Sequence, residues 1–236
     1  GRQCWLRRWV GTARKMCGIF AYIGDKQAAA LLVTALKRLE YRGYDSAGVC
    51  IQGSPLKIRK KVGKVNNLET ECASACEDGK LEGTSGIAHT RWATHGKPSD
   101  LNAHPHTDSA RTIAVVHNGV VENYNALKQE LAGKGYTFTS ETDTELLAHL
   151  VHDLHKQLPE ATWTQVVAMT LQLVEGAYGV VFLFQEDPDL IVGARKGSPL
   201  ILGVGTGENM LASDASAIIE HTKDVVYIRD GELVEL

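Results

Sequence analysis

Short apolar segments bounded by turn residues occur in clusters along this 236-residue chain, and that clustering constrains the fold most. We expect strands at 18–23, 50–51, 56–62, 86–90 and 112–117, and a run of short strands through the last quarter. Helical patterns fall between the clusters, at 27–39, 68–80, 123–133, 142–155 and 162–174. Because strands and helices do not alternate strictly, the pattern favours an α+β fold of packed, largely antiparallel sheets flanked by helices.

The charge of the chain argues against two classes of partner. A formal net charge of −3 provides no basic field for nucleic acid or for an anionic membrane. No apolar run approaches the roughly 20 residues that a membrane span needs. We therefore expect small molecules or proteins as partners, with no nucleic acid and no membrane.

The first fifteen residues differ from the rest in composition. They contain five basic residues and no acid, so the remainder of the chain carries −8. A short basic segment of this kind is typical of a targeting remnant or of upstream or vector sequence. We expect residues 1–16 to be a leader or extension, removed or non-native, and residues 17–236 to form one domain.

The stretch "MCGI" places a cysteine directly after a methionine. If Cys17 becomes the first residue, its α-amine, with a pKa of about 7.7–8.0, can accept the proton of its own thiol. While Met16 remains attached, that nitrogen is an amide and cannot act as a base. The alternative is a buried cysteine at the start of a strand. The five cysteines form no disulfide framework, which fits a reducing compartment, and the C-x3-C pair Cys72 and Cys76 lacks the second ligand pair of a zinc site.

A polar loop follows the strand predicted at 86–90, in the stretch "HTRWATHG". Arg91 offers a planar fork for a carboxylate, and Trp92, Thr94 and His95 can wall and hydrogen-bond a small polar ligand. A surface arginine beside a core tryptophan is the alternative.

Two further stretches carry candidate site residues. Asn118-Gly119, in "HNG", reads either as a turn at the end of a strand or as a side-chain amide and a backbone N–H aimed at one oxygen, as in an oxyanion hole. In "SETDTELL", Thr142 and Glu145 resemble a capping box, which places Asp143 in the first helical turn. Asp143 then either interacts with the helix dipole or pairs with a substrate ammonium group.

The histidines outside these stretches favour structural roles. His149, His152 and His155 repeat at three-residue spacing on one predicted helix, and we interpret them as surface or edge residues rather than metal ligands. His104 and His106 are expected to make structural hydrogen bonds, although His104 is also a candidate to support the site.

Taken in order, "MCGI", "EYRGYDSAG", "HTRWATHG", "HNG" and "SETDTE" resemble the glutaminase domains of the glutamine:fructose-6-phosphate aminotransferase family. The resemblance extends from Cys17 to Leu236 and implies a four-layer αββα sandwich of the N-terminal-nucleophile hydrolase type. It also implies hydrolysis of glutamine to glutamate and ammonia. The roles implied by the resemblance are Cys17 as nucleophile, Asn118 and Gly119 as oxyanion hole, Arg91 with Thr94 and His95 as carboxylate anchor, Asp143 as ammonium partner, and Trp92 in a loop that closes over glutamine.

The resemblance further implies partners and a location. It implies no cofactor and no metal, a cytoplasmic enzyme, and a homo-oligomer at full length. The family's sugar-phosphate isomerase module, which uses fructose 6-phosphate as acceptor, is absent from this chain. Three alternatives remain open: a non-catalytic glutamine-binding or regulatory domain with a blocked Cys17, the glutaminase domain of another class II amidotransferase, and an inert fragment that needs the missing module.

Overall fold

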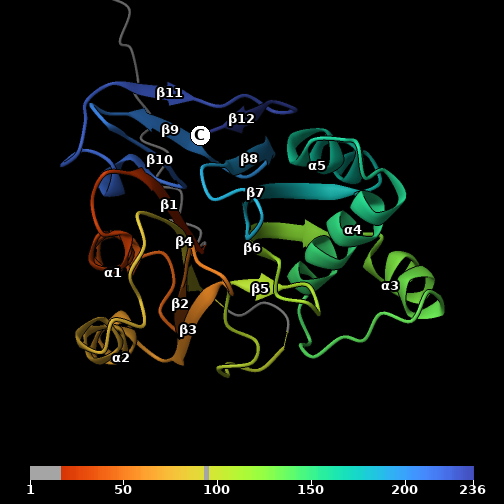
Figure 1. Ribbon diagram of the computed structural model, residues 1–236, viewed down its shortest axis with the longest axis horizontal. Helices are drawn as coiled ribbons and strands as arrows, with labels where there is room; N and C mark the ends of the chain where they lie inside the picture. The colour runs from red at the N-terminus through yellow and green to blue at the C-terminus, as the bar shows by residue number, and fades with distance from the viewer. Residues whose placement is uncertain (1–16, 93–95) are drawn as a thin grey trace, which may run out of the picture.

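The computed structural model describes residues 17–92 and 96–236, and in this part of the chain two antiparallel sheets pack face to face (Figure 1). The larger sheet has the order β11-β9-β10-β1-β4-β2-β3. Its strands are β1 (Gly18–Gly24), β2 (Ser46–Ile51), β3 (Lys57–Val62), β4 (Ser85–Arg91), β9 (Ile201–Val204), β10 (Glu208–Ala212) and β11 (Val225–Tyr227). The smaller sheet has the order β12-β8-β7-β6-β5. Its strands are β5 (His106–Thr107), β6 (Ile113–Val121), β7 (Gly176–Phe184), β8 (Ile191–Lys196) and β12 (Leu233–Glu235).

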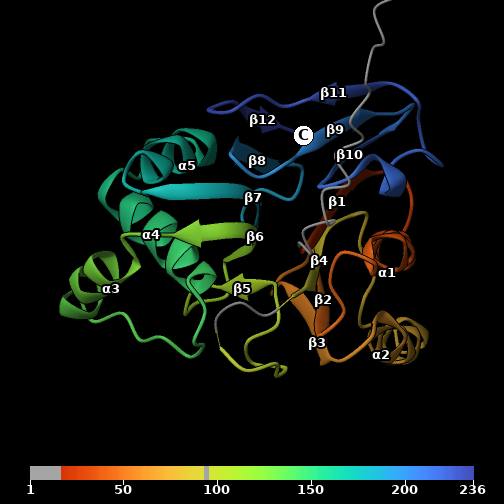
Figure 2. The same cartoon turned by 180° about the vertical axis from the view of Figure 1, so that it is seen from behind.

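Helices cover the outer face of each sheet, as the two opposite views in Figures 1 and 2 show. The helices on the larger sheet are α1 (Ala28–Leu39) and α2 (Val65–Glu77). Those on the smaller sheet are α3 (Tyr124–Gly133), α4 (Thr144–Gln157) and α5 (Trp163–Gln172). The layers therefore run helix, sheet, sheet, helix, and the predicted α+β sandwich is confirmed.

Three apolar clusters hold these layers together. One joins α1 and α2 to the larger sheet, and includes Phe20 and Leu36. A second joins α4 and α5 to the smaller sheet, and includes Leu147 and Phe182. The third fills the space between the sheets and includes Ile19 from β1. Alternation along β1 explains this arrangement, because successive residues of a strand point to opposite faces.

Several predicted elements differ from the structure at their ends. The helix expected at 68–80 begins at Val65 and ends at Glu77, and the strand expected at 112–117 continues to Val121. β5 was not predicted, because two residues are too short to carry a periodic signal. The antiparallel pairing expected in the last quarter is confirmed by β7 with β8 and by β9 with β10. The predicted leader, residues 1–16, lies outside the described residues. No helix in the described part of the chain is long and apolar enough to cross a lipid bilayer.

Candidate active site

Cys17 lies directly before β1, where the two sheets meet. The backbone that follows it is fixed by side chains, since Gly18 N–H donates to Thr90 Oγ1 at 3.1 Å and Ile19 N–H donates to Ser213 Oγ at 2.9 Å. The carbonyl oxygen of Cys17 accepts hydrogen bonds from Asn118 Nδ2 at 2.9 Å and from Arg42 Nε at 3.3 Å. The larger sheet therefore supplies the cysteine, while β6 of the smaller sheet supplies one of the donors that hold it.

The thiol of Cys17 is oriented by the backbone of Trp92. The N–H of Trp92 donates to Sγ at 3.2 Å, and Sγ lies 3.7 Å from the carbonyl oxygen of the same residue. Burial raises the pKa of the Cys17 thiol, although the Trp92 N–H and the nearby Arg91 act in the opposite direction. A thiol in this setting stays protonated near neutral pH, so nucleophilic attack requires a base that takes its proton.

Asn118 and Gly119 lie inside β6, so the turn interpretation of Asn-Gly is wrong. Asn118 is opposite Gly179 and Gly119 is opposite Tyr178 in the ladder with β7. Gly119 has φ = +143°, and a side chain there would collide with the carbonyl oxygen of Ala177. Only glycine fits this position, and it lines the same pocket as Cys17.

The side-chain amide of Asn118 has a defined orientation. Its Nδ2 points to the Cys17 carbonyl, while its Oδ1 lies 2.9 Å from His89 Nε2. Turning the amide over would bring two oxygens together, so His89 is the donor and Asn118 Oδ1 the acceptor. Since an amide nitrogen carries two hydrogens, one remains available for a further acceptor near Cys17.

Arg91 ends β4 and is buried, with 4% of its surface exposed. Its Nη2 donates to the carbonyl oxygen of Gly96 at 3.4 Å. The segment "YRGYDSAG" braces this end of β4, because Asp45 N–H donates to the Arg91 carbonyl at 3.1 Å. A Cβ on Gly43 would lie 2.8 Å from the Arg91 carbonyl carbon, so a glycine is needed for the close approach. The guanidinium thus reaches the pocket from a rigid strand end.

Asp143 occupies the N-cap position of α4, which corrects the predicted capping box. Its side chain does not cap the helix, and its Oδ2 accepts from Val121 N–H at 2.9 Å. Glu145 points back instead to Thr139 and Ser140, so Thr142 is not the cap. Asp143 therefore lies one residue before the predicted first turn and ties the start of α4 to the end of β6.

The structure brings most of the predicted site residues together. One pocket is lined by Cys17, Arg91, Trp92, His104, His117, Gly119, Thr142, Asp143 and Thr144. Asn118 reaches it through its bond to the Cys17 carbonyl. Thr94 and His95 lie outside the described residues. A cation and a carboxylate thus share the pocket with a thiol and with amide donors, a set that matches an α-amino acid bearing a carbonyl on its side chain.

Buried histidines surround this pocket: His104 was singled out from the sequence, whereas His89 and His117 were not. His104 Nε2 lies 2.7 Å from Thr144 Oγ1, the hydrogen bond expected for it, and His117 Nδ1 lies 3.2 Å from the same hydroxyl. His117 Nδ1 is also 3.9 Å from Asp143 Oδ1. Burial lowers the pKa of both imidazoles and holds them neutral. The sequence held a signal for His89 and His117, because they are the first residues of "HTRWATHG" and "HNG".

The remaining predicted histidines belong to α4. His149 was expected at the surface or an edge, but it is buried, with 1% of its surface exposed, and it packs against Tyr136 and Phe138. His152 Nδ1 lies 2.8 Å from the hydroxyl of Tyr136. The prediction failed for His149 because this stretch of α4 is packed all round. In the described part of the chain these side chains make no cluster that could hold a metal ion.

Comparisons with known proteins give consistent results. The sequence family described as "Glutamine amidotransferase domain" matches residues 89–220. The chain is 54% identical over 218 residues to a Chlorobaculum tepidum protein named glutamine–fructose-6-phosphate aminotransferase (isomerizing), covering 92% of this chain and 35% of that protein. A Pseudomonas putida protein of the same name is 46% identical over 223 residues, covering 94% of this chain and 35% of that protein. The chain therefore spans little more than a third of the length of these relatives.

Two solved structures have a similar fold. One, described as the allosteric regulatory enzyme of purine biosynthesis, has a TM-score of 0.75 and 27% identity, over 93% of this chain and 46% of that chain. The other, a glutamine phosphoribosylpyrophosphate amidotransferase from B. subtilis, has a TM-score of 0.72 and 25% identity, over 93% of this chain and 49% of that chain. Both similarities cover nearly the whole of this chain.

Proposed function

Since this chain belongs to the family of glutamine amidotransferase domains, we propose that it hydrolyses the side-chain amide of L-glutamine to glutamate and ammonia through a thioester on Cys17. The observation that carries the proposal is the shared pocket, in which the thiol lies beside Gly119, Arg91 and Asp143. Glutamine offers one carboxylate, one ammonium group and one amide carbonyl, and the pocket has a group suited to each.

The proposed reaction begins with proton transfer from the thiol. With the Met16–Cys17 peptide bond cut, the α-amine of Cys17 accepts this proton, and the thiolate attacks the amide carbon of glutamine. Negative charge then develops on the amide oxygen, where Asn118 Nδ2 and the Gly119 N–H donate to it. The C–N bond breaks as the leaving group takes a proton and departs as ammonia. Water attacks the thioester, which releases glutamate and restores the thiol.

Substrate positioning falls to Arg91 and Asp143 in this proposal. Arg91 pairs with the α-carboxylate of glutamine, and Asp143 pairs with its α-ammonium group, assisted by Thr94, His95 and the loop that contains Trp92. The burial of Arg91 and the bond from Val121 N–H to Asp143 support this assignment, because both side chains are held before substrate arrives.

A test of the nucleophile compares two forms of the protein. We expect the form that begins at Cys17 to release glutamate and ammonia from L-glutamine, and its Cys17→Ala variant to be inactive. The form that retains residues 1–16 should be inactive or nearly so, because its Cys17 nitrogen is an amide. Intact-mass measurement establishes which species is present in each assay. Full activity of a species that retains residues 1–16 would rule out the free-amine mechanism.

If the Met16–Cys17 peptide bond stays intact, Cys17 lacks its base. The protein would then be a domain that binds glutamine without hydrolysing it. An electrophilic glutamine analogue distinguishes the two functions, since stoichiometric labelling of Cys17 is incompatible with an inert site. If glutamine raises the midpoint temperature of a cooperative thermal unfolding transition while the analogue does not label Cys17, the binding domain is favoured. Another class II amidotransferase has less support, because the two curated relatives named above are 46–54% identical to this chain, whereas the two solved structures are 25–27% identical.

We further propose that the ammonia serves a sugar-phosphate isomerase module, with fructose 6-phosphate as acceptor, in a longer protein that forms a homo-oligomer. The names of the curated relatives support this proposal, and this chain matches 35% of their length. A cytoplasmic location is also proposed. The thiols of Cys17, Cys50, Cys72 and Cys76 are all free, as in proteins of a reducing compartment.

A further inference from the structure

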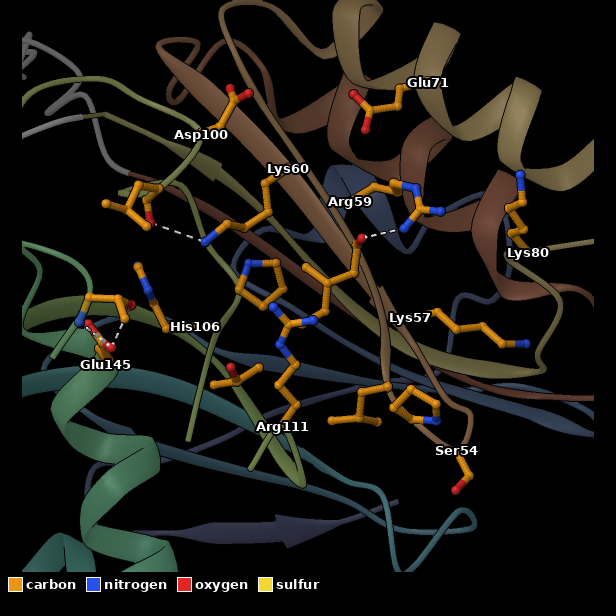
Figure 3. Close-up of a pocket in the computed structure, with 17 residues that line it drawn as sticks. Ser54, Lys57, Arg59, Lys60, Glu71, Lys80, Asp100, His106, Arg111 and Glu145 are labelled. Atoms are coloured by element: carbon orange, nitrogen blue, oxygen red, sulfur yellow. Dashed lines mark hydrogen bonds between the residues drawn. The ribbon is translucent and has the colours of Figure 1, made fainter. Parts of the chain in front are cut away.

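A large groove lies at the end of the sandwich where the edge strands β3 and β5 are both open (Figure 3). Its volume is about 760 Å³, within the range of small-molecule sites. It is lined by β3, by the segment that leads into β5, by Arg111 after β5 and by Glu145 at the start of α4. Among the described residues, none that lines this groove also lines the Cys17 pocket.

The acidic side chains of the groove are already engaged. Glu71 Oε2 lies 3.3 Å from Lys61 Nζ, and Asp100 Oδ1 accepts from Val62 N–H at 2.6 Å. Glu145 accepts from backbone and hydroxyl groups on its own side of the groove. These carboxylates are therefore poor partners for the cations that share the groove.

The cations, in contrast, have almost no carboxylate partners. Five cationic side chains line the groove, namely Lys57, Arg59, Lys60, Lys80 and Arg111. In the described ranges, Lys80 forms an ion pair, with Asp78, and no ion pair is recorded for the other four. The groove thus carries more positive than negative charge, and four of these five cations form no ion pair within the described residues.

Lys60 is half-buried and lies on the inner face of its sheet. It faces the space between the sheets, because Lys57 and Arg59 alternate with it on β3 and face α2. Its Nζ donates to the carbonyl oxygen of Leu101 at 3.1 Å and makes no other recorded bond in the part of the chain that the structure describes. Burial lowers the pKa of Lys60 to about 8, despite the opposing effect of Glu145 and Asp100. An ammonium group with one neutral acceptor retains two hydrogens for a ligand.

Arg111 approaches the same space from the opposite wall. It has φ = +58°, an uncommon conformation for a residue with a side chain. The turn that holds it is fixed by Asp108, whose carboxylate accepts from the N–H groups of Thr112 and Ile113 at 2.8 Å. Figure 3 shows the side chains of Lys60 and Arg111 extending into the groove from the two sides. Lys60 and Arg111 thus present two cations to one cavity whose carboxylates already accept other hydrogen bonds or ion pairs, and this arrangement suits an anion.

We propose that this groove binds a phosphate group, free or carried by a small metabolite, between Lys60 and Arg111. Phosphate has the chemistry that the two residues recognise, since the arginine fork binds two of its oxygens and the lysine ammonium acts as a point charge. The excess of cations over engaged carboxylates matches a dianion. The remaining volume accommodates the organic part of a phosphomonoester, beside the apolar side chains of Leu56 and Ile58.

The experiment titrates the protein with inorganic phosphate and with glucose 6-phosphate, using ³¹P NMR line broadening and calorimetry. We expect saturable binding to one site, weakened about tenfold or more by Lys60→Met and by Arg111→Asn. Asparagine tolerates the positive φ of position 111, so the second variant keeps the turn. Lys223→Met, at an exposed lysine distant in sequence and outside the groove, is the matched control and should bind as the unaltered protein does.

The two probes distinguish the sources of the phosphate. Tighter binding of glucose 6-phosphate identifies a phosphorylated metabolite as the ligand, and equal binding identifies free phosphate. The proposal is overturned if neither probe saturates a site at about 10 mM, or if the double variant of Lys60 and Arg111 binds as the Lys223→Met control does. The measurement requires no turnover, so its failure leaves the proposed glutamine hydrolysis untouched.

Discussion

Single side chains determine which way the candidate oxyanion donors point. Asn118 directs its nitrogen toward Cys17 because His89 occupies its oxygen. His89 is fully buried, and burial lowers its pKa to about 3, so its ring is neutral and its Nε2 carries the one hydrogen. His89 is therefore a positioning residue that acts through Asn118. Gly119 contributes through its backbone, because it adopts a conformation in which a side chain would collide with Ala177.

We predict that His89→Phe lowers the kcat of glutamine hydrolysis by about 10²–10³, because the Asn118 amide loses its orientation. The KM for glutamine should change little, since His89 does not line the pocket. His89→Gln supplies an N–H donor and should recover part of the loss. Steady-state kinetics on the form that begins at Cys17 measure both parameters. An unchanged kcat in His89→Phe, with the fold intact by circular dichroism, would contradict the positioning role.

At the scale of elements, the start of α4 depends on a carboxylate that points away from its helix. Glu145 accepts from Thr139 N–H at 2.8 Å, from Ser140 N–H at 2.6 Å and from both hydroxyls. Burial opposes ionisation of Glu145, but these bonds and the His149 ring, whose Nε2 is 3.7 Å away, hold its pKa well below its ordinary value. The segment before α4 is thereby fixed, and with it the position of Asp143.

We expect Glu145→Gln to lower the free energy of unfolding by about 1–3 kcal/mol at pH 7, because an amide cannot accept all of these hydrogen bonds. The folded-state pKa of Glu145 is depressed, so its contribution is present above the unfolded value of about 4.3 and is lost as the pH falls below it. The difference in the free energy of unfolding between Glu145→Gln and the unaltered protein should therefore decrease as the pH falls from 5 to about 3. Urea denaturation at several pH values measures this difference. Glu186→Gln, at an exposed glutamate, serves as control, and an equal loss in both variants would refute the assignment.

At the scale of the whole molecule, the site exists only where the two sheets meet. Cys17 and Arg91 come from the larger sheet, while Asn118, Gly119 and Asp143 come from β6 and the start of α4. Each half holds the other through the bond between the Cys17 carbonyl and the Asn118 amide. Neither sheet with its covering helices would form the pocket alone.

The same junction makes the molecule sensitive to acid. Four buried histidines, His89, His104, His106 and His117, have pKa values lowered by burial. Their folded pKa lies below the unfolded value of about 6.5, so the unfolded chain binds more protons once the pH falls below 6.5. We predict that unfolding at pH 5.5 takes up roughly three to four protons through these residues, so that stability falls by about 4–5 kcal/mol per pH unit.

Denaturant titrations from pH 8 to pH 5 test this prediction. Stability should be nearly flat above pH 7, as far as these histidines are concerned, and should decline steeply below pH 6.5. A triple replacement of His89, His104 and His106 by glutamine should flatten the decline, even if it lowers stability at pH 7. Constant stability between pH 7 and pH 5 would contradict the neutral, buried state of the cluster.

The sequence by itself determined the class of the fold, most helices and strands, and the stretches that meet in the pocket. Periodic burial is a local property, so α1 and β1 could be recognised from neighbouring residues alone. The residue types needed for the chemistry, a thiol, an amide, a guanidinium and a carboxylate, were likewise apparent in Cys17, Asn118, Arg91 and Asp143.

Only the tertiary structure decided how these residues are used. Asn118 looked like part of a turn because its partner strand, β7, lies some sixty residues further along the chain. Thr142 resembled a helix cap until the contacts of Glu145 with Thr139 and Ser140 were known, and His149 looked exposed until its aromatic neighbours were placed. Strand pairing depends on groups that are distant in sequence, while the cap and the burial of His149 depend on how the neighbouring segment folds back onto α4. Periodicity along the chain carries no information about either kind of contact.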